Sequence, residues 1–162
     1  MVKIVKKFNN GVTMVEKVLL VLMFSALIVL GILQVLLRSV FKAPLAWSEG
    51  MLTYLFIWSS FVGAAMGMNK MQHFCIDALV DLFPKIVRYL IEQMIYVLLV
   101  VISIFVVYYG TKLALAQRMI LMPTIRATMM WPYLSLPFSF LLIGLHSISN
   151  FICGFERKEE EQ

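Results

Sequence analysis

Residues 18–37 read VLLVLMFSALIVLGILQVLL, a run of 20 residues in which only Ser25 and Gln34 have polar side chains. As an α-helix rising about 1.5 Å per residue, the run is about 30 Å long, which matches the hydrocarbon core of a bilayer. A basic start at residues 1–7 precedes it, as in a signal peptide. However, the apolar part of a signal peptide spans only about 7–15 residues, and no A-x-A cleavage motif follows the run. We therefore expect a retained membrane-spanning helix.

The composition of the chain indicates the same class of protein. Of its 162 residues, 62% are hydrophobic and 14% are charged, whereas soluble domains have roughly 45–50% apolar and about 25% charged residues. A chain this short cannot bury such an excess in one water-soluble core. This excludes a soluble enzyme, a nucleic-acid-binding domain and a disordered chain. The expected partners therefore include membrane lipids and no nucleic acid, despite a net charge of +5.

Three further apolar runs follow the first one along the chain. Only helices and closed barrels span lipid, and the alternating pattern of barrel strands is missing. We therefore predict an all-α integral membrane protein with a single membrane domain over residues 1–162. Its predicted parts are transmembrane helices at about 18–37, 48–68, 85–110 and 133–152, a short surface helix at about 72–83, and a charged cytoplasmic tail at 153–162.

The segment between the second and third runs has a different character. Residues 72–83 are too few and too charged to span a bilayer. Asp77 and Asp81 lie four positions apart, which places them on one face of a helix whose other positions are largely apolar. This pattern favours a short amphipathic helix on the membrane surface. An ordinary polar connection without a fixed helix remains the alternative.

The distribution of lysine and arginine predicts the orientation, because cytoplasmic loops are enriched in both. With the N-terminus in the cytoplasm, nine of these residues lie on the inner side and five on the outer side, so both termini are predicted to be cytoplasmic. The nine are Lys3, Lys6, Lys7, Lys17, Lys70, Lys85, Arg88, Arg157 and Lys158, and the five are Arg38, Lys42, Lys112, Arg118 and Arg126.

The sequence indicates no chemistry of its own. No Ser/His/Asp set, GxGxxG motif or P-loop occurs, so we expect no enzyme activity, no catalytic residue and no cofactor. Cys75 and Cys153 are far apart and outside any CxxC spacing, and no metal site is predicted. A carrier needs charged or strongly polar groups near the bilayer midplane. The deep apolar runs contain little besides serine, so no substrate-binding residue is predicted either.

The few larger polar residues are interpreted as structural. His146 is expected to make a hydrogen bond between packed helices, and His73 to lie at the membrane interface. A haem held by both is disfavoured, because they come from a surface segment and a membrane helix. Glu16 and Glu92 lie near helix ends, which argues against a self-sufficient exporter with a membrane-embedded acid.

Two surfaces are candidates for contacts with other proteins. Ser59, Gly63 and Gly67 recur every four residues, and small residues let another helix approach closely in lipid. They form either a docking face for a partner subunit or a packing face within this chain. Arg118 and Arg126 belong to a basic outer side that could steer a soluble partner, or they reach toward lipid phosphates.

Residues 44–84 read PLAWSEGMLTYLFIWSSFVGAAMGMNKMQHFCIDALVDLFP. Together with the arginine that closes the first helix, this stretch resembles the small membrane subunit of tripartite ATP-independent periplasmic (TRAP) transporters. Met122-Pro123 and Leu136-Pro137 look like the second half of that family, and the resemblance covers about residues 15–150. One departure is Gly50, where the family often has a second acidic residue. The residues that carry the resemblance are Arg38, Trp47, Glu49, Trp58, Gly63, Lys70, His73 and Asp77.

The resemblance implies a function through partners. In this family a large membrane permease subunit carries the substrate and ion sites and moves as an elevator, and the small subunit braces its scaffold. A periplasmic solute-binding protein delivers an organic acid, such as sialic acid or a C4-dicarboxylate, and an ion gradient, usually of sodium, drives uptake across the bacterial inner membrane. Arg38 and Glu49 are expected to pair at the outer edge. A structural or assembly subunit of another inner-membrane complex, with no transport role, is the alternative.

Overall fold

The computed structural model describes residues 2–42, 45–80 and 85–160, with side chains at 5, 7–42, 45–68, 87, 90, 91 and 93–152. The described residues form α1 (Val2–Ser39), α2 (Ala46–Val80), α3 (Lys85–Ala116), the 3-10 helix η1 (Gln117–Met119) and α4 (Met130–Glu160). Four stretches are long and apolar enough to cross a membrane: Lys7–Ser39, Ala46–Met68, Gln93–Met119 and Met130–Ile152. The prediction of an all-α membrane protein with four spanning helices is confirmed.

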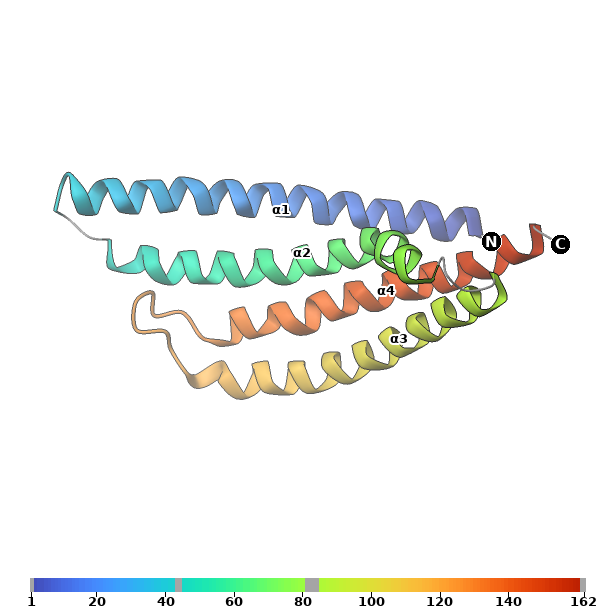
Figure 1. The fold of residues 1–162 in the computed structure, drawn as a ribbon. Helices are drawn as coiled ribbons and strands as arrows, with labels where there is room; N and C mark the ends of the chain where they lie inside the picture. Colours follow the sequence, from blue (N-terminus) through green and yellow to red (C-terminus); the bar gives the residue numbers. More distant parts are fainter. Residues whose placement is uncertain (1, 43–44, 81–84, 161–162) are drawn as a thin grey trace.

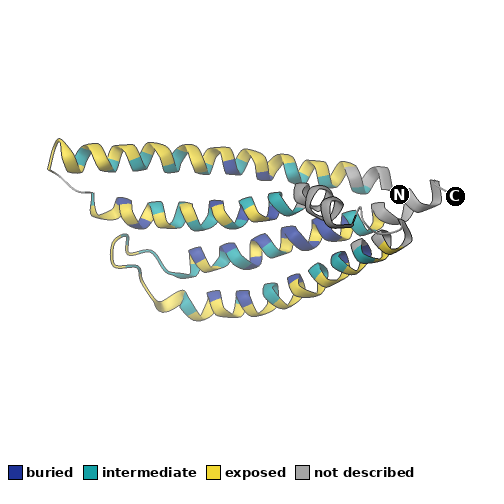
Figure 2. Ribbon diagram, viewed as in Figure 1, coloured by how far each residue is buried: buried dark blue, intermediate teal, exposed yellow. Residues whose placement is uncertain are grey.

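The central element is α4, which packs against each of the other three long helices and most extensively against α3. Figure 1 shows the helices side by side in the order α1, α2, α4, α3, with both chain termini at one end of the molecule. Buried positions are concentrated on α4, whereas α1 is exposed along most of its length (Figure 2). The fold is therefore a layer of helices with a small interior, which leaves wide apolar faces for lipid or for another protein.

Small residues bring α3 and α4 close together. A Cβ atom added to Gly144 of α4 would lie 3.2 Å from Cβ of Ser103 on α3, and one added to Gly110 would lie 3.3 Å from Cδ of Pro137. Pro137 thus lies inside α4 at a point where the neighbouring helix offers no side chain. Helices in lipid associate by such close packing because lipid chains are as apolar as the side chains themselves.

A second small core joins α1, α2 and α4. Ala65 of α2 is buried with Leu142 and Ile143 of α4, and Val12 of α1 packs against them. This junction lies toward the end of the molecule that holds both termini, where α1 reaches α4 (Figure 1).

Helix α2 continues beyond its membrane-spanning stretch. Its backbone is helical through Val80, and Figure 1 shows its last turns, in green, leaving the direction of the preceding part. The predicted surface helix at 72–83 therefore falls partly on the C-terminal turns of α2. Residues 81–84 lie outside the described residues, as do the side chains of 72–80, so the membrane-surface position of this segment stays a prediction.

At the opposite end, residues 120–129 form a short hairpin that leads from η1 into α4; we call it the 120–129 hairpin. The amide of Met129 donates a hydrogen bond to the carbonyl oxygen of Ile120 over 2.8 Å. The amide of Met122 donates one to the carbonyl oxygen of Ala127, also over 2.8 Å. Arg126 adopts a positive φ of 50° at the turn. These bonds give the predicted loop between the third and fourth helices a defined shape.

Candidate functional site

Three polar side chains meet between α1 and α4, within the stretches that can span the membrane. Nε2 of His146 lies 2.9 and 3.1 Å from the two carboxylate oxygens of Glu16, and Nδ1 lies 2.6 Å from Oδ1 of Asn9. Glu16 is 2% exposed and His146 is 1% exposed. We call this group the Asn9–His146–Glu16 cluster. A buried carboxylate in an apolar setting requires such partners, because an unpaired buried charge is costly.

The helical repeat explains how α1 supplies two members of the cluster. Asn9 and Glu16 are seven residues apart, which is two helical turns, so both lie on the side of α1 that faces α4. The hydrogen bond predicted for His146 is confirmed. Sequence reasoning missed its partners, because it placed Glu16 near a helix end. The seven-residue spacing was the available signal, but it does not say which helix lies opposite.

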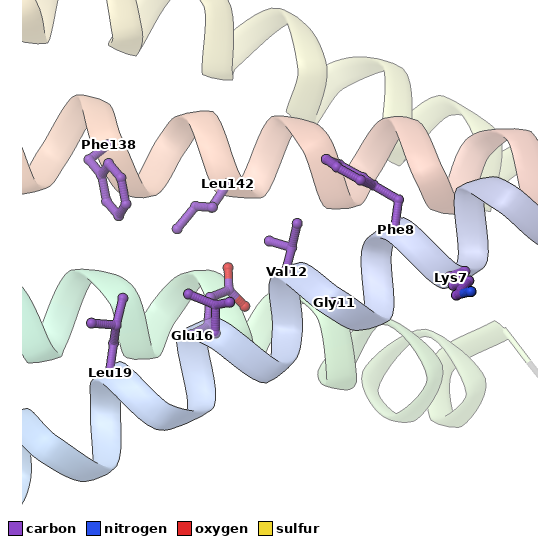
Figure 3. A pocket seen from close by; sticks show the side chains of 9 residues that line it. Lys7, Phe8, Gly11, Val12, Glu16, Leu19, Phe138 and Leu142 are labelled. Atoms are coloured by element: carbon purple, nitrogen blue, oxygen red, sulfur yellow. The ribbon is translucent and has the colours of Figure 1, made fainter.

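An open groove of about 590 Å³ runs beside the cluster. Figure 3 shows Glu16 and Leu19 of α1 on one wall, with Phe138 and Leu142 of α4 pointing toward them from the other. Lys7 is the basic residue in its lining. Most of the lining side chains are apolar, so the groove is suited to apolar groups rather than to a charged solute.

The structure separates the three residues of the predicted docking stripe. Ser59 is buried and donates a hydrogen bond from its hydroxyl to the carbonyl oxygen of Phe56, 3.0 Å away. A Cβ added to Gly63 would lie 3.8 Å from Leu20, so this glycine faces α1 of the same chain. A Cβ added to Gly67 would meet none of the described atoms within 4 Å. Among the described residues, Gly67 is thus the position of the stripe with space for a partner, and docking itself stays a prediction.

The predicted docking arginines lie at the end of the molecule opposite the termini, where Arg126 belongs to the 120–129 hairpin and Arg118 to η1 (Figure 1). Both are exposed. The hairpin and the start of α4 are held on α2 by the Tyr54 hydroxyl, 3.0 Å from the carbonyl oxygen of Thr128, and by Nε1 of Trp58, 3.2 Å from that of Trp131. Arg126 is therefore presented on an anchored loop, and Arg118 lies in η1 just before it.

Of the residues that carry the family resemblance, three are exposed, Trp58 and Gly63 are half-buried, and three have side chains outside the described residues. Arg38, Trp47 and Glu49 are exposed, and the expected Arg38–Glu49 ion pair is not formed. In the part of the chain that the structure describes, the contact between an acidic and a basic side chain is that of Glu16 with His146, which is an ion pair when the ring is protonated. The side chains of Lys70, His73 and Asp77 lie outside the described residues. No group of three or more His, Cys, Asp or Glu that could hold a metal occurs among the residues with described side chains.

Comparison with known proteins agrees with this architecture. Residues 27–157 match the family model of the DctQ component of tripartite ATP-independent periplasmic transporters. The chain is 30% identical over 90 residues to the sialic acid TRAP transporter permease protein SiaT of Haemophilus influenzae (strain 86-028NP), which covers 56% of this chain and 15% of that protein. It is 36% identical over 73 residues to a protein of another Haemophilus influenzae strain named as a TRAP transporter small permease, covering 43% of this chain and 45% of the relative.

The chain thus spans less than half the length of either relative. The family match, by contrast, extends from the middle of α1 through all later helices into the last turns of α4. Together with the four spanning helices, it makes the protein a multi-pass protein of the inner membrane. The chain belongs to the DctQ family, the small permease component of TRAP transporters, and is a transport component rather than an enzyme.

Proposed function

We propose that this chain braces the scaffold of a large, elevator-type permease subunit and helps a periplasmic solute-binding protein to dock. The assembly takes up an organic acid, such as sialic acid or a C4-dicarboxylate, driven by an ion gradient, usually of sodium. The observation that carries the proposal is the match to SiaT, in which 90 residues of this chain correspond to 15% of a much longer permease. A second relative is named as a TRAP transporter small permease, which supports the same role beside a large permease subunit.

The polar groups inside the described membrane helices support a bracing role. Most buried polar residues are serines, and Ser48, Ser59 and Ser135 each donate a hydrogen bond to the backbone carbonyl three residues earlier. The carboxylate of Glu16 is already occupied by His146. An organic acid entering the described interior would meet no uncompensated cation there, and transferring it from water would be costly.

The orientation in the membrane follows from the predicted cytoplasmic termini. Because both termini lie at one end of the molecule (Figure 1), the 120–129 hairpin with Arg126 is then periplasmic. Its anchoring by Tyr54 and Trp58 supports a fixed docking surface. The substrate class rests on the name of the SiaT relative and on the family.

The test of the bracing role is co-purification with the large subunit. We expect Gly67→Leu to lower the yield of co-purified large permease at least about fivefold, since a new side chain would fill space available to a partner helix; that factor corresponds to about 1 kcal/mol. Gly31→Leu is the matched control, because a Cβ at Gly31 also meets no atom within 4 Å but lies on α1, outside the stripe.

Equal yields for Gly67→Leu and the unchanged protein would remove the stripe as a docking face. Reconstitution tests the wider proposal. Vesicles with the small subunit alone should not accumulate sialic acid or a C4-dicarboxylate, whereas vesicles that also contain the large subunit, supplied with the binding protein and a sodium gradient, should do so. Accumulation by the small subunit alone would contradict the proposed function.

A further inference from the structure

We propose that the Asn9–His146–Glu16 cluster is a proton-binding site: one proton held between Glu16 and His146 makes the cluster electrically neutral and fixes the N-terminal half of α1 to α4. This proton site belongs to the chain alone. It depends neither on a transported solute nor on a partner subunit.

The hydrogen bonds of the cluster fix how many hydrogens it holds. Each of the two ring nitrogens of His146 faces an oxygen, Nδ1 at 2.6 Å from Asn9 Oδ1 and Nε2 at 2.9 Å from Glu16 Oε1. With Oδ1 of Asn9 facing the ring, as in this structure, the hydrogen between them is on Nδ1, because a carbonyl oxygen only accepts. The link between Nε2 and the carboxylate requires a second hydrogen, carried either by the ring or by the carboxyl group. Both forms contain the same number of protons.

The shared proton also sets the net charge of the cluster. With two hydrogens in place, the cluster is either an imidazolium paired with a carboxylate or a neutral ring beside a carboxylic acid, and its total charge is zero in both. Without the shared proton, the cluster would carry one negative charge on groups that are at most 2% exposed. A net charge on groups this deeply buried is strongly unfavourable. Lys7, the basic residue of the adjoining groove, is itself exposed. Burial and hydrogen-bond geometry thus favour the proton-bound form.

The cluster also helps to join α1 to α4. α1 is exposed along most of its length (Figure 2), and its contact with α4 is much smaller than its contact with α2. Beside the cluster, Val12 supplies the apolar part of the α1–α4 junction by packing against the core that contains Leu142. Interhelical hydrogen bonds therefore form a large share of what joins these two helices.

Nitrogen-15 NMR of histidine-labelled full-length chain in lipid nanodiscs tests the proton count directly. The chain has two histidines, so the ring signals can be assigned by comparison with His73→Gln. We expect Nδ1 of His146 to carry a proton at neutral pH, and the shared proton to appear either as a second N–H at Nε2 or, by carbon-13 NMR of Glu16, as a protonated carboxyl group. A bare Nε2 beside an ionised Glu16 would overturn the proposal. An unprotonated Nδ1, accepting from a reversed Asn9 amide, would mean that the shared proton is missing and would overturn the proposal.

Thiol cross-linking tests the mechanical role. Cys75 and Cys153 are first replaced by serine, and the pair Val12→Cys and Leu142→Cys then reports the approach of α1 to α4. We expect Glu16→Gln, which keeps a neutral hydrogen-bonding group, to leave the cross-linking yield within about twofold. We expect Glu16→Leu, which removes that group, to lower it about fivefold, a factor that follows from about 1 kcal/mol.

The matched control is Gln34→Leu, which also replaces a polar residue of α1; its buried Oε1 has no hydrogen-bond partner. We expect no loss of cross-linking for this variant. Equal yields for Glu16→Leu and Gln34→Leu would show that the cluster does not hold the helices together. Because the NMR experiment uses the unchanged cluster, a folding failure of any variant leaves the proton count testable.

Discussion

At the residue scale, Gly50 explains a departure of this chain from its family. A Cβ atom added at this buried position would lie 2.5 Å from the Thr124 hydroxyl oxygen and 3.3 Å from two carbon atoms of Ile125. The space that a second acidic side chain would need is therefore filled by the 120–129 hairpin. In this chain the hairpin packs directly against the start of α2.

The close packing at Gly50 predicts that one methyl group added there destabilises the hairpin. We expect Gly50→Ala to loosen the hairpin at a cost of about 1–3 kcal/mol, typical of overpacking. Trypsin cleavage after Arg126 should then become at least about fivefold faster in detergent, as a shift of about 1 kcal/mol in hairpin docking implies.

Adding Thr124→Ala to Gly50→Ala removes the closest atom and should restore much of the resistance to trypsin. Thr124→Ala alone is the control for loss of the threonine itself. Unchanged cleavage in Gly50→Ala would show that Thr124 and Ile125 adjust at little cost, and that the hairpin does not depend on Gly50.

The polar residues also show how much of the candidate site can be predicted from the sequence. A histidine inside an apolar helix needs a hydrogen-bond partner because lipid supplies none, so the bond of His146 was predictable. The identity of Glu16 and Asn9 as partners was not, because it depends on how far α1 and α4 slide past each other. That register is set by packing along both helices and leaves no local mark in the sequence.

At the scale of helices, α3 and α4 approach closely because Gly144 and Gly110 have no side chain at their contact. Gly144 faces Ser103 so closely that an added Cβ would lie 3.2 Å from Cβ of that serine. We expect Gly144→Val to destabilise the helix pair by about 1–3 kcal/mol, measured as a lower midpoint in an SDS titration followed by circular dichroism. Gly31→Val is the matched control, since a Cβ there meets no atom within 4 Å.

Ser103→Gly supplies a rescue for the same contact. Combined with Gly144→Val, it removes the opposing Cβ and should recover part of the lost midpoint, and the non-additivity measures the coupling between the two positions. Strict additivity of the two changes would mean that the helices do not meet at these residues.

At the scale of the whole molecule, the sequence predicted the class and number of helices but not their layout. Length and apolarity are enough to identify a membrane span, because the bilayer thickness is fixed. The order α1, α2, α4, α3 and the central place of α4 come from contacts between Gly144 and Ser103 and around Ala65, and many helix pairs in any sequence offer such small residues. The defined hairpin was likewise unforeseen, because its backbone bonds require no particular side chains.

The layout also defines the electrostatic test of the proposed docking surface. Arg126 occupies a positive φ of 50°, a region that asparagine tolerates better than most residues, so Arg126→Asn removes the charge without adding strain. Combined with Arg118→Gln, it should slow binding-protein-dependent uptake several-fold at low salt, because charged surfaces accelerate encounter. The difference should shrink as salt rises, since exposed charges are screened beyond about 10 Å at 0.1 M.

The chain offers a close control for this charge effect in Lys42, which is exposed and also has a positive φ, of 51°. It follows α1 at the same end of the molecule but lies outside the hairpin, so Lys42→Asn makes the same kind of change at a different place. If docking uses the hairpin, uptake with Lys42→Asn stays near that of the unchanged protein. If Lys42→Asn slows uptake as much as the arginine changes do, the overall charge of this face steers the partner. If the arginine changes have no effect at low salt, both side chains contact lipid phosphates instead. The binding protein must then be recognised elsewhere in the assembly.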